Sequence, residues 1–357
     1  MDGTTSRRAG PWQESEPLEC VMVIPEAPDV ATFAFRAPSG AWFDYLPGQF
    51  ITLELPVPGG PVQRTYTISA SPSRPLTISV TVKAQADSVG SRWMLDHLRP
   101  GDTIRAWGPA GLFTLPARPD RKYLFIAAGS GITPMMSMAS YLYDYGDQPD
   151  ARLIACARRP SELIFRQRLI HMASRVPGLR LSFVVEEEEP YAVWTGYLGR
   201  FNQLMLSLMA PDYLEREVYC CGPAPFMQVV RDSLNALGFD MDHYHQESFV
   251  APVETPADEP PIDDVIPQEA ADAEIDFARS GVSIACHETD TVLAISRAQG
   301  VRIPFGCTFG VCGTCKVRKL SGEVHMVHNG GISEDDIADG YILACCSNPI
   351  GPVKIDA

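Results

Sequence analysis

The chain has 357 residues, a hydrophobic fraction of 45% and a formal net charge of −15 at pH 7. This length is more than one hydrophobic core normally supports, so we expect two or three domains. The acidic balance, without a basic stripe, argues against nucleic acid as a partner. We also expect a cytoplasmic protein with no membrane partner, because no apolar run could span a bilayer and the first residues lack the apolar stretch of a secretory signal.

Residues 1–16 are polar, and we expect a disordered N-terminus there. From 17 to 118 the chain alternates short runs of β-forming residues with Pro and Gly, which predicts an antiparallel β-barrel. One helix over residues 91–98 interrupts the strands and ends at Pro100-Gly101. The predicted strands are 18–24, 32–36, 49–55, 65–69, 76–83 and 103–108.

Residues 119–250 change to apolar strands that alternate with helices. The continuous apolar run at 123–128 is typical of a parallel strand that is buried on both faces. Strands and helices in alternation predict a doubly wound α/β domain. Further predicted elements are strands at 152–157, 179–185 and 217–223 and helices at 135–142, 161–175 and 226–237.

Charge and composition divide the rest of the chain. Residues 251–272 are rich in Pro, hold seven acidic side chains and lack Lys and Arg, which predicts a solvated linker. Residues 273–357 form a third predicted domain. A linker of this kind would let that domain turn between the rest of the chain and a partner protein.

Three cysteines of this last domain, Cys307, Cys312 and Cys315, are spaced C-x4-C-x2-C, and Cys345 follows after 29 intervening residues. Ten cysteines in a cytoplasmic chain favour thiols and metal ligation over disulfides. The spacing is that of a plant-type [2Fe-2S] cluster. The alternative is zinc, which favours C-x2-C pairs or mixed Cys/His sets and fits this spacing poorly. We therefore predict that these four thiolates bind a [2Fe-2S] cluster.

The run Arg64-Thr65-Tyr66-Thr67-Ile68-Ser69 lies on a predicted barrel strand. Arg64 offers a cationic fork to a phosphate, and Tyr66 offers a flat aromatic face to a ring system. An ordinary strand with alternating side chains is the alternative interpretation. Gly90 and Ser91 open the predicted helix of the barrel, where backbone N–H groups would bind a diphosphate. The alternative there is a plain serine N-cap.

The run Gly129-Ser130-Gly131-Ile132-Thr133-Pro134 follows a buried strand and opens a helix, which is the context that a glycine-rich phosphate loop requires. Its glycines would let a pyrophosphate approach the helix N-terminus closely. Cys221-Gly222-Pro223 ends the last predicted parallel strand, at the edge where α/β sheets bind ligands. For Cys221 the alternative is a buried structural thiol.

In this order, the motifs resemble those of the ferredoxin–NADP reductase superfamily, followed by a C-terminal plant-type ferredoxin with a β-grasp fold. The resemblance covers residues 18–250 and 273–357. Within it, the chain is similar to the reductase components of Rieske-type oxygenases that act on quaternary amines such as glycine betaine, and to the reductases of hybrid-cluster proteins. The run 343–346 resembles the ferredoxin ending in which Cys345, and not Cys346, is the cluster ligand.

The resemblance implies FAD rather than FMN, because residues 67–72 and 108–113 look like the FAD-type versions. It implies catalytic roles for Thr67 near flavin N5 and for Cys221 near nicotinamide C4. A third catalytic candidate is Glu247 of an H-x-E-x-F run, for which a charged cap is the alternative. The residues expected to bind FAD or nucleotide are Arg64, Tyr66, Thr67, Ser69, Val82, Gly90, Ser91, Gly129, Gly131, Thr133, Pro134, Cys221, Gly222, Pro223 and Phe249.

Two features bear on the choice between NADH and NADPH. Arg158 and Arg159 follow the second α/β strand and would bind a 2′-phosphate, or form a solvated strand end. The acidic run Glu186–Glu189 would disfavour a 2′-phosphate if it faces the adenosine ribose; the alternative is a solvated loop. We expect NADH, with NADPH as the alternative.

The resemblance also implies a function. The implied protein is an oxidoreductase that passes electrons from NADH through FAD and a [2Fe-2S] cluster to a partner. This partner is the terminal oxygenase of a quaternary-amine demethylating monooxygenase. The alternatives are the reductase of a hybrid-cluster protein and a flavoenzyme that reduces a small molecule directly. An acidic group before Cys345 predicts a basic docking patch on the partner, or else only a solvated surface. Its members are Glu334, Asp335, Asp336 and Asp339.

Overall fold

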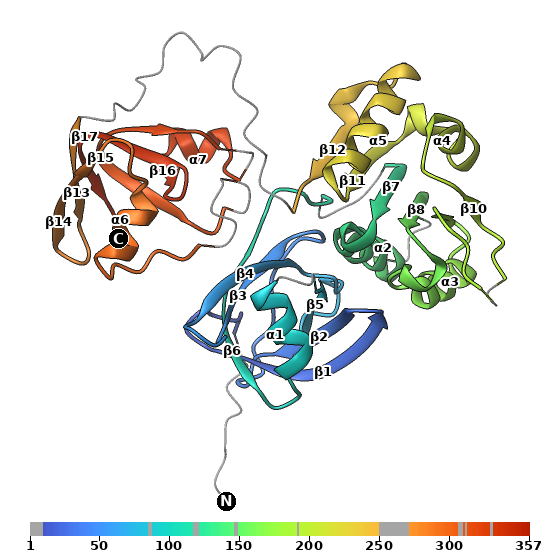
Figure 1. Cartoon of the computed structure of the whole chain (residues 1–357), viewed down its shortest axis with the longest axis horizontal. Helices are drawn as coiled ribbons and strands as arrows, with labels where there is room; N and C mark the ends of the chain where they lie inside the picture. Colours follow the sequence, from blue (N-terminus) through green and yellow to red (C-terminus); the bar gives the residue numbers. More distant parts are fainter. Residues whose placement is uncertain are drawn as a thin grey trace, which may run out of the picture. The chain divides into compact units, whose positions relative to one another are not determined.

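A computed structural model describes residues 10–84, 88–116, 121–145, 149–190, 193–249, 271–305, 310, 313–328 and 331–357 (Figure 1). It contains three sheets, and its contacts divide the chain into two compact units. The first two sheets lie mainly in one unit, and the third sheet lies in the other. In the part of the chain that the structure describes, no helix is both long and apolar enough to cross a membrane.

The first sheet has the strand order β4-β3-β6-β1-β2-β5 and closes into a barrel. Its outer strands meet where Ile68 forms an antiparallel bridge with Val80 and the Ser69 N–H donates to the Ser79 carbonyl at 2.7 Å. Helix α1 (Val89–His97) packs on β3 and β5. The strands are β1 (Leu18–Ala27), β2 (Val30–Arg36), β3 (Phe50–Leu55), β4 (Val62–Thr67), β5 (Ile78–Lys83) and β6 (Thr103–Ala110).

The second sheet is parallel and has the order β10-β9-β8-β7-β11-β12. The order reverses between β7 and β11, which is where such sheets bind ligands. Its strands are β7 (Tyr123–Ala128), β8 (Ala151–Ala157), β9 (Leu179–Val185), β10 (Tyr197–Leu198), β11 (Glu217–Cys221) and β12 (Tyr244–Glu247). Its helices are α2 (Ile132–Tyr145), α3 (Arg166–Arg175), α4 (Gln203–Met209) and α5 (Ala224–Ala236), with short turns η1 (Gly129–Gly131), η2 (Pro160–Glu162), η3 (Tyr213–Glu215) and η4 (Met241–His243).

Alternate residues of β7 point into two separate cores, because successive side chains of a strand face opposite sides of the sheet. Phe125 packs with residues of α2 and α3 on one face. Leu124 and Ile126 pack with residues of α4 and α5 on the other. Both faces are therefore covered by helices, as the continuous apolar run at 123–128 predicts.

Some elements differ from the sequence prediction. The single helix predicted over 161–175 is two elements, η2 and α3, because Phe165 between them takes a left-handed backbone with φ 59°. The strand predicted to reach residue 223 ends at Cys221, since Pro223 has no N–H to donate to the ladder. Residues 10–16 were expected to be disordered, but the structure describes them. Trp12 is buried, and its backbone N–H donates to the Trp42 carbonyl at 2.7 Å.

The third sheet is mixed, with the order β14-β13-β17-β15-β16 and a parallel pair, β13 and β17. The fold classes predicted for the three parts of the chain are confirmed. The exact domain boundaries stay predictions, and residues 1–9 and 251–270 lie outside the described residues. The elements of the third domain are β13 (Asp272–Phe277), β14 (Val282–His287), β15 (Lys316–Met326), β16 (Tyr341–Leu343), β17 (Ser347–Ile355), α6 (Val292–Ala298) and α7 (Glu334–Ala338).

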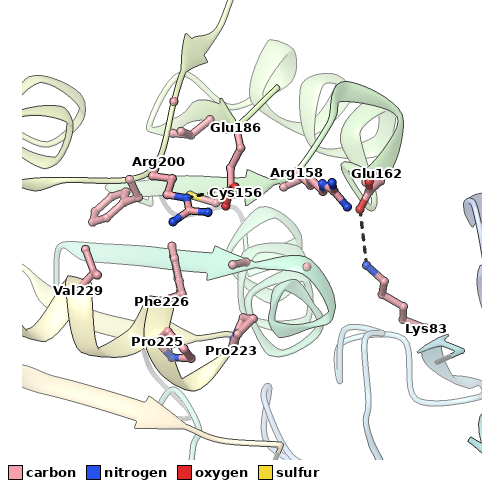
Figure 2. Close-up of a pocket in the computed structure, with 16 residues that line it drawn as sticks. Lys83, Cys156, Arg158, Glu162, Glu186, Arg200, Pro223, Pro225, Phe226 and Val229 are labelled. Carbon is pink, nitrogen blue, oxygen red and sulfur yellow. Dashed lines mark hydrogen bonds and ion pairs between the residues drawn. The ribbon is translucent and has the colours of Figure 1, made fainter. Parts of the chain in front are cut away.

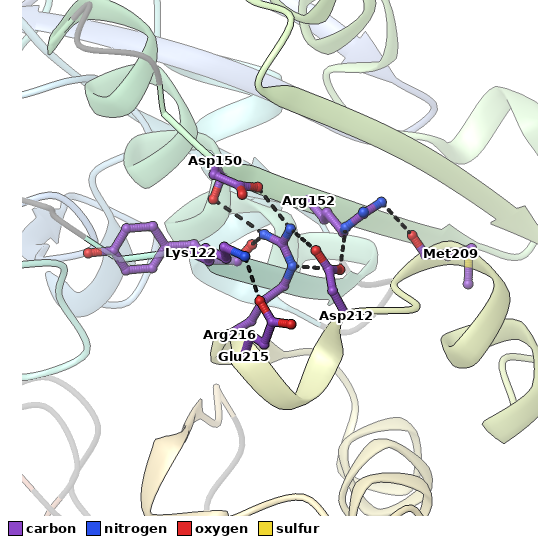
Figure 3. A network of polar contacts seen from close by, with 8 residues as sticks. Lys122, Asp150, Arg152, Met209, Asp212, Glu215 and Arg216 are labelled. Carbon is purple, nitrogen blue, oxygen red and sulfur yellow. Dashed lines mark hydrogen bonds and ion pairs between the residues drawn. The ribbon is translucent and has the colours of Figure 1, made fainter.

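A buried arginine organises the amino-terminal edge of the parallel sheet (Figure 3). The Arg216 side chain is 1% exposed and forms ion pairs with Asp212 and with Asp150. It also donates to the Tyr123 carbonyl at 3.1 Å, and Asp212 pairs in addition with Arg152 at 2.8 Å. The network thus connects β7, β8 and the turn before β11.

We predict that Arg216→Ala lowers the free energy of unfolding by roughly 2–4 kcal/mol at pH 7, because it leaves Asp150 without this cation and Asp212 with Arg152 alone. Hydrogen bonds from Arg216 hold the pKa of Asp212 well below its usual range. A lowered folded-state pKa contributes stability above the unfolded value of about 4, and this stability is lost as the pH falls below it. The difference between wild type and variant should therefore shrink on acidification.

Urea unfolding at pH 7 and pH 3.5, followed by tryptophan fluorescence, measures this difference. The matched control is Arg180→Ala, which removes an exposed arginine of β9 in the same sheet. Equal destabilisation by the two substitutions would contradict the role assigned to Arg216.

Candidate functional site

The glycine-rich loop after β7 lies directly against the end of β11. A Cβ atom on Gly131 would come within 2.3 Å of the Cys221 carbonyl oxygen, and one on Gly222 would lie 2.9 Å from Phe226 Cδ1 and 3.1 Å from Ala128 Cβ. Position 131 therefore requires glycine, and a side chain at position 222 would force its neighbours to shift. The Thr133 hydroxyl, at the start of α2, donates to the Ser130 carbonyl at 3.0 Å and holds the loop in shape.

Five of the predicted nucleotide-binding residues are thus brought together: Gly129, Gly131 and Thr133 around the loop, and Cys221 and Gly222 opposite them. The N–H of Ile132, the first residue of α2, donates to the Gly129 and Ser130 carbonyls, so helical hydrogen bonding already starts in η1. The N–H groups of Gly129–Gly131 therefore lie at the N-terminal end of the combined helix, which is a natural site for a pyrophosphate. The backbone of the chain fits the phosphates of a dinucleotide at this point.

A pocket of about 640 Å³ opens beside this loop (Figure 2). It lies at the carboxyl ends of β7, β8 and β9. The close-up shows Pro223, Pro225 and Phe226, from the start of α5, along one side, and Arg200 and Glu186 across from them. Phe226 stacks edge-on against Phe201 with ring centroids 5.7 Å apart, which gives the pocket an apolar wall suited to a flat base.

The charged residues Arg158, Glu186 and Arg200 at the pocket form ion pairs with one another or with residues beside it. Glu187 contacts both predicted arginines, Arg158 Nε at 3.3 Å and Arg159 Nη2 at 2.9 Å, and Arg159 in particular lowers the pKa of its carboxyl. Arg200 pairs with Glu186 at 3.3 Å. These exposed pairs contribute little to stability, but they neutralise the cations that a 2′-phosphate would need. The arginines and the acidic run, which sequence analysis weighs against each other, are therefore ion-pair partners.

The flavin motif lies where the barrel closes. Arg64 is exposed, and its Nη1 donates to the Gln63 carbonyl at 2.8 Å. Thr67 and Ser69 are buried. The Ser69 hydroxyl bonds to Thr81 Oγ1 at 2.9 Å inside the barrel, and Val82 is 1% exposed within its core. The cofactor contacts predicted for these side chains stay predictions.

Gly90 and Ser91 lie within α1, which begins earlier than predicted, at Val89. Both residues are buried, and the Ser91 hydroxyl donates to Ser88 Oγ at 2.6 Å. The Ser91 side chain therefore stabilises the start of the helix. The diphosphate contact expected of Gly90 and Ser91 stays a prediction.

Cys221 and Glu247 are directly opposite each other in the parallel pair β11–β12. Cys221 is fully buried, and burial raises the pKa of its thiol well above the ordinary value. The Oε2 atom of Glu247 is buried without a hydrogen-bond partner among the described residues, and burial raises the pKa of this carboxyl to about 8. An unpaired buried carboxyl costs free energy, so it is a group whose partner is expected to be a ligand. Phe249, two residues on, is 44% exposed.

Two of the four predicted cluster ligands are described, and the structure places them together. Cys315 and Cys345 are buried, and the Cys345 N–H points at Cys315 Sγ with an N–S distance of 3.4 Å. Cys346 Sγ turns instead toward the Leu343 carbonyl, at 3.7 Å. Gly313, in the same loop, has φ 68°, and a Cβ atom there would lie 2.7 Å from the Gly331 carbonyl oxygen. A side chain at this position would therefore be strained.

Cys307 and Cys312 lie outside the described residues. A buried thiol pair with an amide directed at sulfur suits an iron–sulfur cluster, whose sulfur atoms accept such hydrogen bonds. The described half of the site therefore fits the predicted group.

Comparison with known proteins covers nearly the whole chain. Family models match residues 21–115 as an oxidoreductase FAD-binding domain, 125–232 as an oxidoreductase NAD-binding domain and 275–349 as a 2Fe-2S iron-sulfur cluster binding domain. The stachydrine N-demethylase reductase subunit of Rhizobium meliloti is 60% identical over 346 residues, which are 97% of this chain and 98% of that protein. The glycine betaine monooxygenase reductase subunit of Chromohalobacter salexigens is 45% identical over 350 residues, 95% of this chain and 94% of that protein.

Among solved structures, phthalate dioxygenase reductase is similar with a TM-score of 0.60 and 26% identity. The match covers 96% of this chain and 97% of that one. Phthalate dioxygenase reductase is a modular structure for electron transfer from pyridine nucleotides to a [2Fe-2S] group. The three-domain architecture is therefore shared over both chains almost completely.

An FAD-binding barrel, a nucleotide-binding α/β domain and a ferredoxin domain in one chain define an iron–sulfur flavoprotein oxidoreductase. Its cofactors are FAD, NADH and a [2Fe-2S] cluster, as predicted. At 60% identity over almost the full length of both proteins, the chain belongs to the family of monooxygenase reductase subunits.

The sequence did not indicate how the pocket rim is paired. Glu187 reaches Arg158 and Arg159 across 29 and 28 residues of chain, and Lys83 of β5 approaches Glu162 of η2 at 3.8 Å over the pocket (Figure 2). Such pairs depend on the order of strands in space, which no local pattern records. The sequence showed only that arginines and acidic residues follow neighbouring strands, without saying which of them pair.

We predict that Glu187→Gln raises kcat/KM for NADPH about 5- to 20-fold, because it frees Arg158 and Arg159 to bind a 2′-phosphate. The value for NADH should change less than about twofold, since NADH lacks that phosphate. Steady-state kinetics with both nucleotides measures the ratio. Glu188→Gln removes the next carboxylate of the same loop, for which the structure describes no ion pair, and is the matched control. An unchanged NADPH value in Glu187→Gln would contradict this assignment.

Proposed function

We propose that this protein is the reductase subunit of a Rieske-type monooxygenase that demethylates a betaine, a quaternary ammonium carboxylate of the stachydrine or glycine betaine class. The observation that carries the proposal is the 60% identity to a stachydrine N-demethylase reductase subunit over 98% of that protein's length. The 45% identity to a glycine betaine monooxygenase reductase subunit supports the same substrate class.

The residues of the chain bind and orient in this scheme. The loop Gly129–Gly131, at the N-terminal end of η1 and α2, holds the pyrophosphate of NADH, and the apolar wall around Phe226 receives its base. When bound, FAD takes two electrons from NADH and releases them singly to the [2Fe-2S] cluster, which carries one at a time. Cys221 and Glu247 line the reacting end. Burial raises the pKa of Glu247 to about 8, which favours the protonated carboxyl at neutral pH, and this form can donate a hydrogen bond there.

Thr67, which is 5% exposed at the end of β4, is the third residue to which we assign a role at the reacting end. Its backbone belongs to the strand that carries Arg64 and Tyr66. In this proposal Thr67 contacts the flavin close to N5, Tyr66 packs on the ring, and Arg64 binds the phosphate.

In this proposal only part of the acidic group before Cys345 docks the partner. Asp336 pairs with Lys316 at 3.0 Å and accepts a hydrogen bond from the Ser333 hydroxyl, also at 3.0 Å. Asp335 and Asp339 are exposed. The side chain of Glu334 lies outside the description. We assign partner docking to Asp335 and Asp339, which would face a basic patch on the terminal oxygenase.

The test is NADH-dependent demethylation of stachydrine and glycine betaine by the purified protein together with the terminal oxygenase of a betaine demethylating system. We expect turnover that slows several-fold between low and high salt, and a several-fold slower rate for the double variant Asp335→Asn with Asp339→Asn at low salt. Reduction of ferricyanide by NADH should be the same in both proteins, because it does not need the partner.

The matched control is the double variant Asp44→Asn with Asp242→Asn, which removes the same charge from exposed positions of the other unit. Turnover independent of salt and of Asp335 and Asp339 would contradict the docking surface alone. Rapid ferricyanide reduction with no electron transfer to the oxygenase would contradict the proposed partner. Equal efficiency with a quinone or a hybrid-cluster protein would favour the corresponding alternative.

A further inference from the structure

Helix α2 carries a buried serine that contacts the barrel at two places. Ser137 is 0% exposed. Its hydroxyl donates to the Ala70 carbonyl at 2.7 Å and accepts the Gly48 N–H at 3.3 Å. A hydroxyl has one donor and can accept as well, so both functions are used. The two partners lie 67 and 89 residues away in the chain.

Both partners belong to the flavin side of the molecule. Ala70 directly follows Ser69, the last residue of the flavin motif, and Gly48 lies in the turn that leads into β3. Gly48 has φ 104°, and a Cβ there would come within 2.2 Å of the Phe113 carbonyl oxygen and 2.7 Å of Met138 Cε. The turn at Gly48 is therefore packed closely against α2, and the Ser137 hydroxyl is the point of contact between them.

A second contact attaches the same barrel segment to the end of α2. Asp144 accepts a hydrogen bond from Ser73 Oγ at 2.5 Å and one from Arg74 Nε at 3.0 Å. Ser137 and Asp144 are two helical turns apart, so the segment from Ala70 to Arg74 is held along the helix and not at one point. In the contact with Asp144 the Arg74 side chain is exposed, whereas Ser137 is buried.

The other end of α2 carries the nucleotide loop, whose Gly131 backbone lies against the Cys221 carbonyl. One helix therefore connects the loop that holds the nicotinamide nucleotide with the segment that continues the flavin strand. We propose that Ser137 is a positioning residue that sets the distance between the nicotinamide and the flavin by pinning α2 to Ala70. This inference concerns the established transfer from NADH to FAD, in which two electrons and a proton leave nicotinamide C4 for flavin N5. It does not depend on the proposed oxygenase partner.

The same helix offers a matched control. Ser140 lies one turn further along α2 and is 2% exposed. Its hydroxyl has no hydrogen-bond partner among the described residues. Ser140→Ala therefore removes the same atom from the same buried helix without removing a contact to the barrel.

The experiment is anaerobic stopped-flow mixing of the FAD-loaded full chain with NADH. In Ser137→Ala we expect flavin reduction at saturating NADH to slow about tenfold, because the rate of hydride transfer is sensitive to sub-ångström misplacement. The Kd of NADH should stay within about twofold of the wild type. The long-wavelength charge-transfer absorbance of the nicotinamide–flavin complex, which reports ring overlap, should weaken. Ser137→Thr, which keeps the hydroxyl, should restore both the rate and the absorbance.

Ser140→Ala should match the wild type in rate and in charge-transfer absorbance. If Ser137→Ala behaves like Ser140→Ala in both measurements, the proposal is wrong. If Ser137→Ala does not fold, Ser137→Cys keeps the side-chain volume with a weaker donor and takes its place. An intermediate rate and absorbance in that variant would support the proposal, and wild-type values would overturn it.

Discussion

The nucleotide site depends on how closely two stretches of backbone approach each other after β7 and β11. Gly131 and Gly222 lie at that approach; a side chain at Gly131 would collide with the backbone of Cys221, and one at Gly222 would press on Ala128 at the end of β7. Because the strand order reverses between β7 and β11, the connections leave in opposite directions and a pocket opens between them. The loop, the pocket and the Cys221–Glu247 pair all take their positions from this contact.

The charges around the pocket follow a consistent arrangement. A chain with a net charge of −15 binds a dinucleotide that is itself an anion. Arg158, Arg159 and Arg200 each pair with a carboxylate. In this account the pyrophosphate is therefore held mainly by backbone N–H groups of Gly129–Gly131, at the N-terminal end of η1 and α2, which bind phosphate without a net positive charge. Such a site suits a nucleotide without a 2′-phosphate.

Local motifs were predictable from the sequence because they depend on residues that are neighbours in the chain. The loop at 129–134 concerns a short segment, and the structure has it between a strand and a helix as predicted. The last long parallel strand was also predicted, although it ends at Cys221 and not at residue 223. The choice of Cys345 over Cys346 as cluster ligand rests on a resemblance and stays a prediction. The polar strand β12 was not predicted, since Tyr244–Glu247 lacks an apolar pattern and pairs with β11 alone in the described sheet. The contacts of Ser137 and Glu187 join segments far apart in the chain, so only the folded arrangement reveals them.

The side-chain directions of the flavin motif show a further limit of sequence analysis. Ser69 and Val82 are predicted to bind cofactor, and this stays a prediction; in the structure the Ser69 hydroxyl bonds to Thr81 Oγ1, and Val82 packs in the barrel core. A motif identifies a strand position, but the twist and closure of the barrel decide which way each side chain points. The backbone of these residues remains the part that the motif predicts.

The central claim is that this one chain passes electrons from NADH through FAD to its [2Fe-2S] cluster. The most direct measurement is anaerobic reduction of the holoprotein by NADH, followed by flavin absorbance and by freeze-quenched electron paramagnetic resonance of the cluster. The account predicts that flavin absorbance falls first, and that the signal of the reduced cluster then appears in an amount comparable to the chain. Flavin that is reduced while the cluster stays oxidised, or a cluster that is reduced equally fast in protein stripped of FAD, would contradict it.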